Sequence, residues 1–224
     1  ERVGYIIQLE CDGKSGFGEV APLPGFSQED VEQAGIQLQH ELELWSHNNP
    51  QTSFEELYPS VAFGLSMAMM ELRGDLNAEG NYQAAPLCTG DPDELIPVLN
   101  GMKGEKVAKV KVGLEEPCLK PEDSLAFAID HGVAIAWDET LQEAVRSPEF
   151  DLSDLTGVKA VVIKPTLIGS VERCVAIIER AQQLGIKPIL SSSIESSLGL
   201  TQIARLAQQY LPNEVPGLDT IGLY

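Results

Sequence analysis

The sequence has few cysteines and histidines and lacks several common active-site motifs, which disfavours several kinds of functional site. None of its four cysteines forms a Cys-x-x-Cys pair, and their spacing fits no zinc-binding pattern. Its three histidines lie far apart in the chain, and we interpret them as structural or solvated residues. The sequence also lacks a glycine-rich phosphate loop and a nucleophile-elbow motif. We therefore expect the four cysteines to be reduced thiols. We do not expect a zinc site, a phosphate-binding loop or a nucleophile-elbow active site.

Positive charge and long apolar runs are scarce as well. Fifteen lysines and arginines against 34 acidic residues give a net charge of −19, which disfavours nucleic acid and anionic membranes as partners. The same excess of carboxylates is compatible with cation binding. Because we find no signal peptide and no apolar run long enough to span a membrane, we expect a cytoplasmic protein.

The first part of the chain predicts an α+β domain. Residues 3–9 alternate apolar and polar types, and a turn at 11–16 leads into a second strand. Ser27 to Asp30 fits a capping box before a helix, and Pro59 fits the start of another helix. Because strands come first and helices second, we expect residues 1–80 to form one α+β domain.

From residue 81 the chain alternates predicted strands and helices. The expected strands are 84–88, 106–113, 133–139, 159–165 and 187–193, and the expected helices are 91–99, 124–129, 170–184 and 198–210. This order is typical of a parallel sheet with helices outside it. Several strands end in a polar group beyond small or aliphatic side chains, as the C-terminal rim of a (β/α) barrel requires. We therefore predict an α/β fold in which residues 81–224 form a barrel domain.

Two lysines are neighbours on one face of a predicted strand. Residues 106–113 alternate with a period of two, so Lys109 and Lys111 share a face. Lysine is common on wet edge strands, where it guards against aggregation, and for this strand alone that interpretation stays open. A buried lysine instead needs a shifted pKa or neighbouring carboxylates.

Carboxylates follow other strands of the predicted barrel. Glu115, Asp138 and Lys164 fall at strand ends, where they would converge with Lys109 and Lys111. Carboxylates at this rim suit Mg²⁺, and a lysine beside a cation can abstract a proton α to a carboxylate. An internal salt-bridge network without catalysis is the alternative.

A serine-rich segment lies at the last predicted strand end. Residues 191–197 read Ser-Ser-Ser-Ile-Glu-Ser-Ser and lead into a helix. Hydroxyls and free amides at a helix N-terminus suit anion recognition. Ordinary N-capping accounts for one or two of these serines, but not readily for all five.

One junction conflicts with a continuous barrel. Lys111 and Glu115 both fit strand ends, with only Val-Gly-Leu between them. Successive parallel strands need a crossover of about a dozen residues or more. Either Glu115 is outside a parallel strand, or residues are missing between Gly113 and Glu115.

Motifs along almost the whole chain resemble those of one family. They are Lys109-Val-Lys111, Glu115-Glu-Pro, Ala136-Trp-Asp-Glu139, Val162-Ile-Lys164-Pro, residues 191–197, Gly18-Glu-Val-Ala-Pro-Leu-Pro-Gly-Phe-Ser27, Pro59-Ser-Val-Ala-Phe-Gly64 and Pro216-Gly-Leu-Asp219. Together they resemble the o-succinylbenzoate synthases of the enolase superfamily, in their proteobacterial form. The resemblance implies an enolase-like modified (β/α) barrel with an α+β capping domain.

The resemblance also implies an activity and a set of residue roles. The activity is Mg²⁺-dependent syn dehydration of a small carboxylate, 2-succinyl-6-hydroxy-2,4-cyclohexadiene-1-carboxylate, to o-succinylbenzoate in menaquinone biosynthesis. Lys111 would take the α-proton, Lys164 would stabilise the enediolate from the opposite face, and Lys109 would support Lys111. Glu115 and Asp138 would bind the metal. Positions that match substrate-binding residues are Leu87, Ser191, Ser193 and Gly217. We expect a monomer.

The sequence departs from the family in three places. Family members carry a strand–helix unit, with a further metal ligand in an Asp-x-Asn motif, where this chain runs from Gly113 to Glu115. The family's first strand with its mobile capping loop, and its last segment, would lie before Glu1 and after Tyr224. We therefore expect a gap in the barrel wall and a break in the backbone path from Gly113 to Glu115. The strands on either side of the gap should be separated by two strand-pairing distances of about 4.8 Å each.

Two other functions stay open. Lysines on opposite faces suit N-acylamino acid racemisation on the same framework equally well. A metal-free, non-catalytic remnant that acts as a binding module is the alternative from another class.

Overall fold

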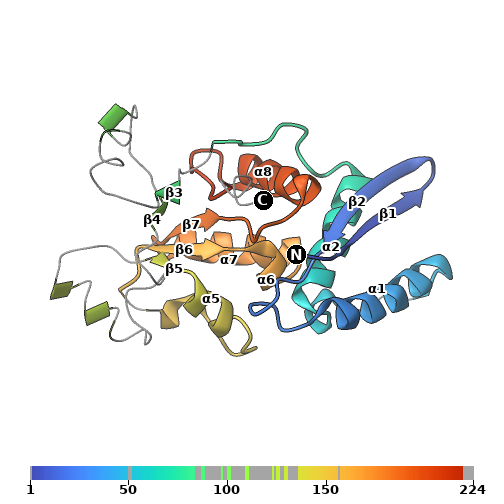
Figure 1. The fold of residues 1–224 in the computed structure, drawn as a ribbon, viewed down its shortest axis with the longest axis horizontal. Helices are drawn as coiled ribbons and strands as arrows, with labels where there is room; N and C mark the ends of the chain where they lie inside the picture. The colour runs from blue at the N-terminus through green and yellow to red at the C-terminus, as the bar shows by residue number, and fades with distance from the viewer. Residues whose placement is uncertain are drawn as a thin grey trace.

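The computed structural model describes residues 2–49, 52–83, 136–155 and 157–218, with short pieces at 87–88, 97, 100–101, 109–110, 123, 125–126 and 129–130. Figure 1 shows a hairpin with helices α1 (Val31–Ser46) and α2 (Pro59–Arg73) on one side, and a parallel sheet with its helices on the other. Among the described residues, no helix is both long and apolar enough to cross a membrane.

The N-terminal sequence forms the predicted hairpin. β1 (Tyr5–Cys11) pairs antiparallel with β2 (Lys14–Val20). Asp12 and Gly13 connect the strands with φ of 50° and 75°, the two positive angles that a type I′ turn requires. The Asp-Gly pair therefore fixes the register of the hairpin.

The buried face of the hairpin is shorter than its sequence pattern predicts. Ile7 and Leu9 are buried, whereas Val3 and Tyr5 are exposed. Tyr5 lies beside helix α1 instead, where its hydroxyl donates to the carbonyl oxygen of Val31 at 3.2 Å. The alternation of apolar and polar residues does not show where the helices that cover this face of the hairpin end.

Helix α1 (Val31–Ser46) begins at a different capping box from the predicted one. Asp30 is the N-cap and accepts from Gln33 N at 2.8 Å, while Gln33 Oε1 accepts from Asp30 N at 3.0 Å. The predicted box from Ser27 to Asp30 is wrong, because Ser27 Oγ accepts from Leu23 N in the preceding turn. Asp is as good an N-cap as Ser, and Gln33 completes the reciprocal pair.

Helix α2 (Pro59–Arg73) starts at the predicted proline and is buried from residue 59 to residue 68. It packs against the hairpin with almost no space between the two backbones. A Cβ at Gly18 would lie 1.9 Å from the carbonyl oxygen of Gly64, and one at Gly16 would lie 2.0 Å from that of Ala68. Glycine is required at both positions of β2 because the helix backbone occupies the place of a side chain.

The second half of the described chain confirms the predicted strand–helix alternation. β5 (Ala136–Trp137), β6 (Ala160–Ile163) and β7 (Lys187–Leu190) form a parallel sheet in that order. β6 and β7 are shorter than predicted, and Pro165 already begins a helix. Further helices among the described residues are η1 (Phe54–Glu56), α5 (Glu139–Ala144), η2 (Leu152–Asp154), α6 (Pro165–Ile168), α7 (Val171–Gln183) and α8 (Ser197–Tyr210).

The two faces of the parallel sheet are buried to different depths. The face that packs against helices carries the fully buried residues Trp137, Val161, Ile163 and Leu190. The other face carries half-buried Ala136, Ala160, Val162 and Ile189, and leads to Asp138 and Lys164 at the strand ends. This second face is the predicted barrel interior.

A further strand pair forms a separate parallel sheet. β3 (Leu87–Cys88) pairs in parallel with β4 (Lys109–Val110), and Leu87 lies opposite Lys109. The described strands form separate sheets, and no closed barrel is seen among them. The junction at residues 113–115, with its expected break, lies outside the described residues, as does most of the chain from 89 to 135.

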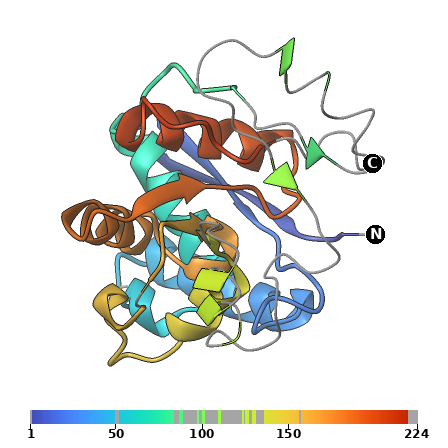
Figure 2. The ribbon, with the colours of Figure 1, turned by 90° about the vertical axis from the view of Figure 1, so that its left-hand side faces the viewer.

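Two hydrophobic clusters share helix α2. Phe63 and Met67 belong to the cluster formed with the parallel sheet, α7 and α8. Val61 and Leu65 belong to the cluster formed with the hairpin and α1. In the quarter-turned view of Figure 2, α8 lies along the parallel sheet with the hairpin behind it. Helix α2 therefore belongs to the packing of both halves.

We expect Gly18→Ala to destabilise the protein by about 3 kcal/mol, because the new Cβ would overlap a helix backbone atom that cannot move alone. The measurement is the free energy of unfolding in urea. Ser15→Ala, at an exposed position of the same strand, should change it by less than about 0.5 kcal/mol. Equal effects of the two substitutions would contradict the close packing of β2 on α2.

Candidate active site

A buried ion pair joins the ends of two parallel strands. Asp138 follows β5, Lys164 follows β6, and Lys164 Nζ lies 2.7 Å from Asp138 Oδ2. The side chain of Asp138 is 5% exposed and that of Lys164 is 8% exposed. Gln142 Nε2 donates to the other carboxylate oxygen of Asp138 at 2.7 Å. The structure thus brings together two of the five charged residues predicted at strand ends.

The meeting of these residues follows from the parallel register. Ala136 pairs with Ala160, so β5 and β6 end at the same edge of the sheet. Pro165 begins α6 directly after Lys164, which turns the chain away and leaves the lysine at this edge. Carboxyl ends of parallel strands are where α/β proteins place their ligand-binding groups.

The serine-rich segment is held by a neighbouring turn of chain. Ser191 forms a parallel bridge with Gly217, and its Oγ donates to Gly217 O at 3.0 Å. Ser192 N donates to the same oxygen at 3.0 Å. A Cβ at Gly217 would lie 2.7 Å from Ser191 Oγ, so glycine allows the close approach. The predicted substrate-binding residues Ser191 and Gly217 are therefore in contact.

Ser193 and Glu195 form a buried polar turn after these residues. Ser193 Oγ is buried and has no hydrogen-bond partner among the described residues. Glu195 is 1% exposed, and its carboxylate accepts from Ser193 N at 2.6 Å and from Thr166 Oγ1 at 2.9 Å. Burial raises the pKa of the Glu195 carboxyl, and the positive charge of Arg2 opposes that rise. Sequence reasoning gave Glu195 no role, although an acidic residue among serines was a visible signal.

Glu19 is a second residue that sequence reasoning missed. This carboxylate of β2 accepts from Ser196 N and from Gly199 N, both at 3.0 Å, at the N-terminus of α8. Ser196 is also the N-cap of α8, through a bond from Leu198 N. A negative charge at a helix N-terminus is stabilising, so the N-terminal half caps a helix of the other half. The signal was the Gly-Glu pair in the motif at residues 18–27.

The remaining predicted site residues are described only in part. Leu87 and Lys109 are brought opposite each other by the β3–β4 pairing of their backbones. Lys111 and Glu115 lie outside the described residues. Among the described residues, no group of three or more His, Cys, Asp or Glu side chains lies close enough to hold a metal ion.

Parallel strands with charged residues at their carboxyl edge, joined to an α+β hairpin module, have close counterparts among solved structures. MenC from Desulfotalea psychrophila LSv54 matches with a TM-score of 0.66 at 19% identity, covering 98% of this chain and 88% of that one. o-Succinylbenzoate synthase from Thermosynechococcus elongatus BP-1, complexed with Mg in its active site, matches with a TM-score of 0.62 at 19% identity, covering 96% and 84%. The molecule has the α/β fold of the enolase superfamily.

Sequence comparison narrows this class to one family. Residues 1–72 match the family model described as the MenC N-terminal domain. The o-succinylbenzoate synthase of Vibrio cholerae serotype O1 is 50% identical over 277 residues, covering all of this chain and 83% of that protein. The chain belongs to the o-succinylbenzoate synthase family, which confirms the resemblance inferred from its motifs.

The same alignment is longer than the chain itself. It runs over 277 residues, whereas the chain has 224, a difference of 53. Because the whole chain is aligned, the additional residues of the relative lie inside the aligned span. The relative therefore has internal sequence that this chain lacks.

We expect Lys164→Met to destabilise the protein by about 3–5 kcal/mol, because Asp138 would keep a buried charge without its cation. The double variant Asp138→Asn/Lys164→Met should recover most of that loss, since both charges are gone. Urea unfolding without Mg²⁺ measures both values.

The matched control is Lys187→Met. Lys187 pairs with Glu214 at 2.7 Å, but these side chains are 38% and 29% exposed, so the loss should stay below about 1 kcal/mol. If Lys164→Met lowered the free energy of unfolding no more than Lys187→Met, the buried ion pair would contribute no more to stability than the exposed one.

Proposed function

We propose that this protein catalyses the syn dehydration of 2-succinyl-6-hydroxy-2,4-cyclohexadiene-1-carboxylate to o-succinylbenzoate, the Mg²⁺-dependent step of menaquinone biosynthesis. The observation that carries this proposal is the buried Lys164–Asp138 pair at the carboxyl edge of parallel strands, in a chain of this family. The pair supplies a cation and a hard oxygen ligand at the same edge. Both are needed to handle a carboxylate substrate.

The chemistry of Asp138 fits a magnesium ligand. Its carboxylate oxygens are hard donors, and both already bind positively polarised groups, from Lys164 and from Gln142. Glu115 would be the second ligand, on the strand that follows the junction. When bound there, Mg²⁺ supplies positive charge to the substrate carboxylate and so acidifies the neighbouring carbon.

Lys111 acts as the base in this mechanism. Its neutral amine takes the proton from the carbon that bears the substrate carboxylate, and the electron pair passes into that carboxylate. The protonated amine then donates the same proton to the departing hydroxyl, which leaves as water while the ring becomes aromatic. Because proton and hydroxyl leave from the same face, one lysine serves both steps.

Lys164 and Lys109 act electrostatically. Lys164 would lie across the site from Lys111 and place positive charge beside the enediolate, where negative charge develops. Lys109, two residues before Lys111 in the sequence, would disfavour a second positive charge there. Removing Lys164 therefore removes both a partner of Asp138 and a stabilising cation.

The proposed substrate-binding positions fall in two pairs of residues at strand ends. Leu87 lies opposite Lys109 in the β3–β4 pair, and Gly217 touches Ser191. Ser193 offers a buried hydroxyl with no partner among the described residues. We assign these positions to the carboxylate and succinyl groups of the substrate, which accept hydrogen bonds and need an apolar wall.

We also propose the domain division and the place of the internal difference. Residues 1–80 form the capping domain and residues 81–224 an incomplete (β/α) barrel, a division that the match of residues 1–72 supports. The 53 additional residues of the Vibrio cholerae protein belong between Gly113 and Glu115. That length suits one strand–helix unit with its loops.

Lys111→Ala should lower kcat by at least about a thousandfold while leaving the fold intact, because the proposed base for that face is removed. Steady-state assays of o-succinylbenzoate formation measure the loss, and thermal unfolding checks the fold.

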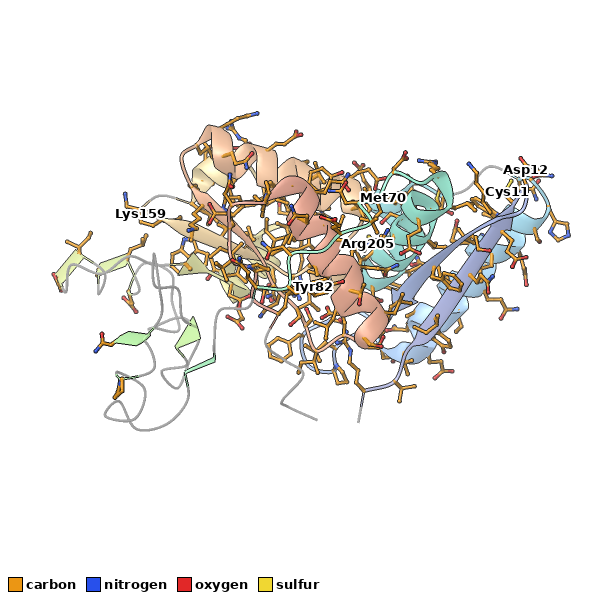
Figure 3. The ribbon with its side chains drawn as sticks, turned by 90° about the horizontal axis from the view of Figure 1, so that it is seen from above. Cys11, Asp12, Met70, Tyr82, Lys159 and Arg205 are labelled. Carbon is orange, nitrogen blue, oxygen red and sulfur yellow. The ribbon has the colours of Figure 1, made fainter. Side chains whose placement is uncertain are left out.

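Lys159→Ala is the matched control for Lys111→Ala. Lys159 is exposed and precedes β6, at the edge of the sheet opposite the site (Figure 3), so its removal should leave kcat unchanged. More than about a tenth of the activity remaining in Lys111→Ala would refute the role of this lysine.

Restoring the internal unit should raise activity and metal affinity. Inserting the corresponding segment of the Vibrio cholerae relative between Gly113 and Glu115 would add the strand–helix unit expected from the family resemblance, whose Asp-x-Asn motif would carry a further metal ligand. We expect Mg²⁺ affinity to rise more than about tenfold, since affinity grows with the number of charged ligands, and kcat/KM to rise with it. Calorimetric titration with Mg²⁺ and turnover assays measure the two changes. A Gly/Ser segment of equal length is the control, and an equal gain from it would overturn the placement.

A further inference from the structure

Glu195 lies where the backbone ladder between two functional strands stops. The last of the backbone bonds between β6 and the end of β7 runs from Ser191 N to Ile163 O at 2.9 Å. Past this point the Glu195 carboxylate joins the two segments, with one oxygen on Thr166 Oγ1 and the other on Ser193 N. Thr166 is two residues after Lys164, so the carboxylate bridges the lysine-bearing end to the serine-bearing end.

The turn that carries Glu195 is fixed on both sides of Ser193. Arg2 donates to the carbonyl oxygen of Ser193 while Glu195 accepts from its amide. Ile194 has φ of 64°, a left-handed conformation that a β-branched residue adopts only when surrounding contacts impose it. This conformation folds the Glu195 side chain back onto Ser193.

We propose that Glu195 is a positioning residue that holds the end of β6 against the end of β7, and so sets the place of Ser193 Oγ relative to Lys164 Nζ. Thr166 and Ser193 are 1% and 3% exposed, so water does not replace these bonds when they are lost. The three residues form one buried brace, Thr166–Glu195–Ser193. This inference rests on the proposed function, because that function is what gives Ser193 Oγ and Lys164 Nζ a substrate.

Two pairs of variants separate the hydrogen bonds of the brace from mere packing. Thr166→Val keeps the shape and removes the hydroxyl, whereas Thr166→Ser keeps the hydroxyl. Glu195→Ala removes both contacts, whereas Glu195→Gln keeps both, with its amide oxygen on Ser193 N and its amide nitrogen on Thr166 Oγ1. Thr166→Val and Glu195→Ala should lower kcat/KM about 10–100-fold, in kcat through Lys164 and in KM through Ser193. Thr166→Ser and Glu195→Gln should stay within about threefold of the parent chain.

A readout without turnover accompanies the kinetics. Amide hydrogen exchange at Ser193 should be about 10–100-fold faster in Glu195→Ala than in the parent chain, the loss expected for one bond to a charged acceptor. Absence of dehydration in the parent chain would count against the proposed function alone, because exchange at Ser193 still decides whether Glu195 holds the turn. Unchanged exchange in Glu195→Ala overturns the brace.

Ser66→Ala is the matched control for loss of a buried hydroxyl. Ser66 Oγ donates to Phe63 O at 3.0 Å and accepts from Val171 N at 2.9 Å, and none of these residues belongs to the brace. Its loss should lower stability and leave kcat and KM unchanged. The positioning role fails if Thr166→Val is no more impaired than Ser66→Ala, or if Thr166→Ser is impaired as strongly as Thr166→Val.

Discussion

The packing of helix α2 against bare backbone is the constraint on which the rest of the structure depends. Gly16 and Gly18 allow the hairpin to lie on the helix without side chains between them. The same helix supplies Phe63 and Met67 to the cluster with the parallel sheet. Because α2 is buried from residue 59 to residue 68, it contributes side chains to both hydrophobic clusters. The place of the site relative to the hairpin follows from this helix and from the direct contacts of β2 with α8.

The site is a set of strand ends held by polar contacts of high sequence separation. Asp138 and Lys164 are paired by the parallel register, and Glu195 continues the connection where the ladder ends. Helix α8 is fixed to the other half by Glu19 at its N-terminus and by the Arg205–Glu71 ion pair near its middle, where Figure 3 shows α8 beside α2. Buried polar networks of this kind specify geometry more than they add stability.

The sequence predicted local features well and long-range partners poorly. The hairpin and the helix start at Pro59 depend on the conformations of the residues themselves, so pattern reasoning found them, although the Asp12-Gly13 turn is shorter than the predicted turn at 11–16. The choice of Asp30 over Ser27 as a cap was not decided by the pattern, because both residues are good N-caps. The partners of Glu195 and Glu19 lie across the fold, and only packing selects them. The junction at 113–115 was recognisable because it violates the geometry of parallel strands.

The carboxylate of Glu19 has a consequence for how the molecule comes apart. It belongs to the hairpin but satisfies amides in the first turn of α8, so separating the two halves would expose a hydrophobic surface and uncap a helix in one event. Losses that occur together make unfolding cooperative. The boundary between the halves therefore has the energetics of a core and not of a hinge. Movement that admits substrate or releases product falls to individual loops, while the two halves stay together.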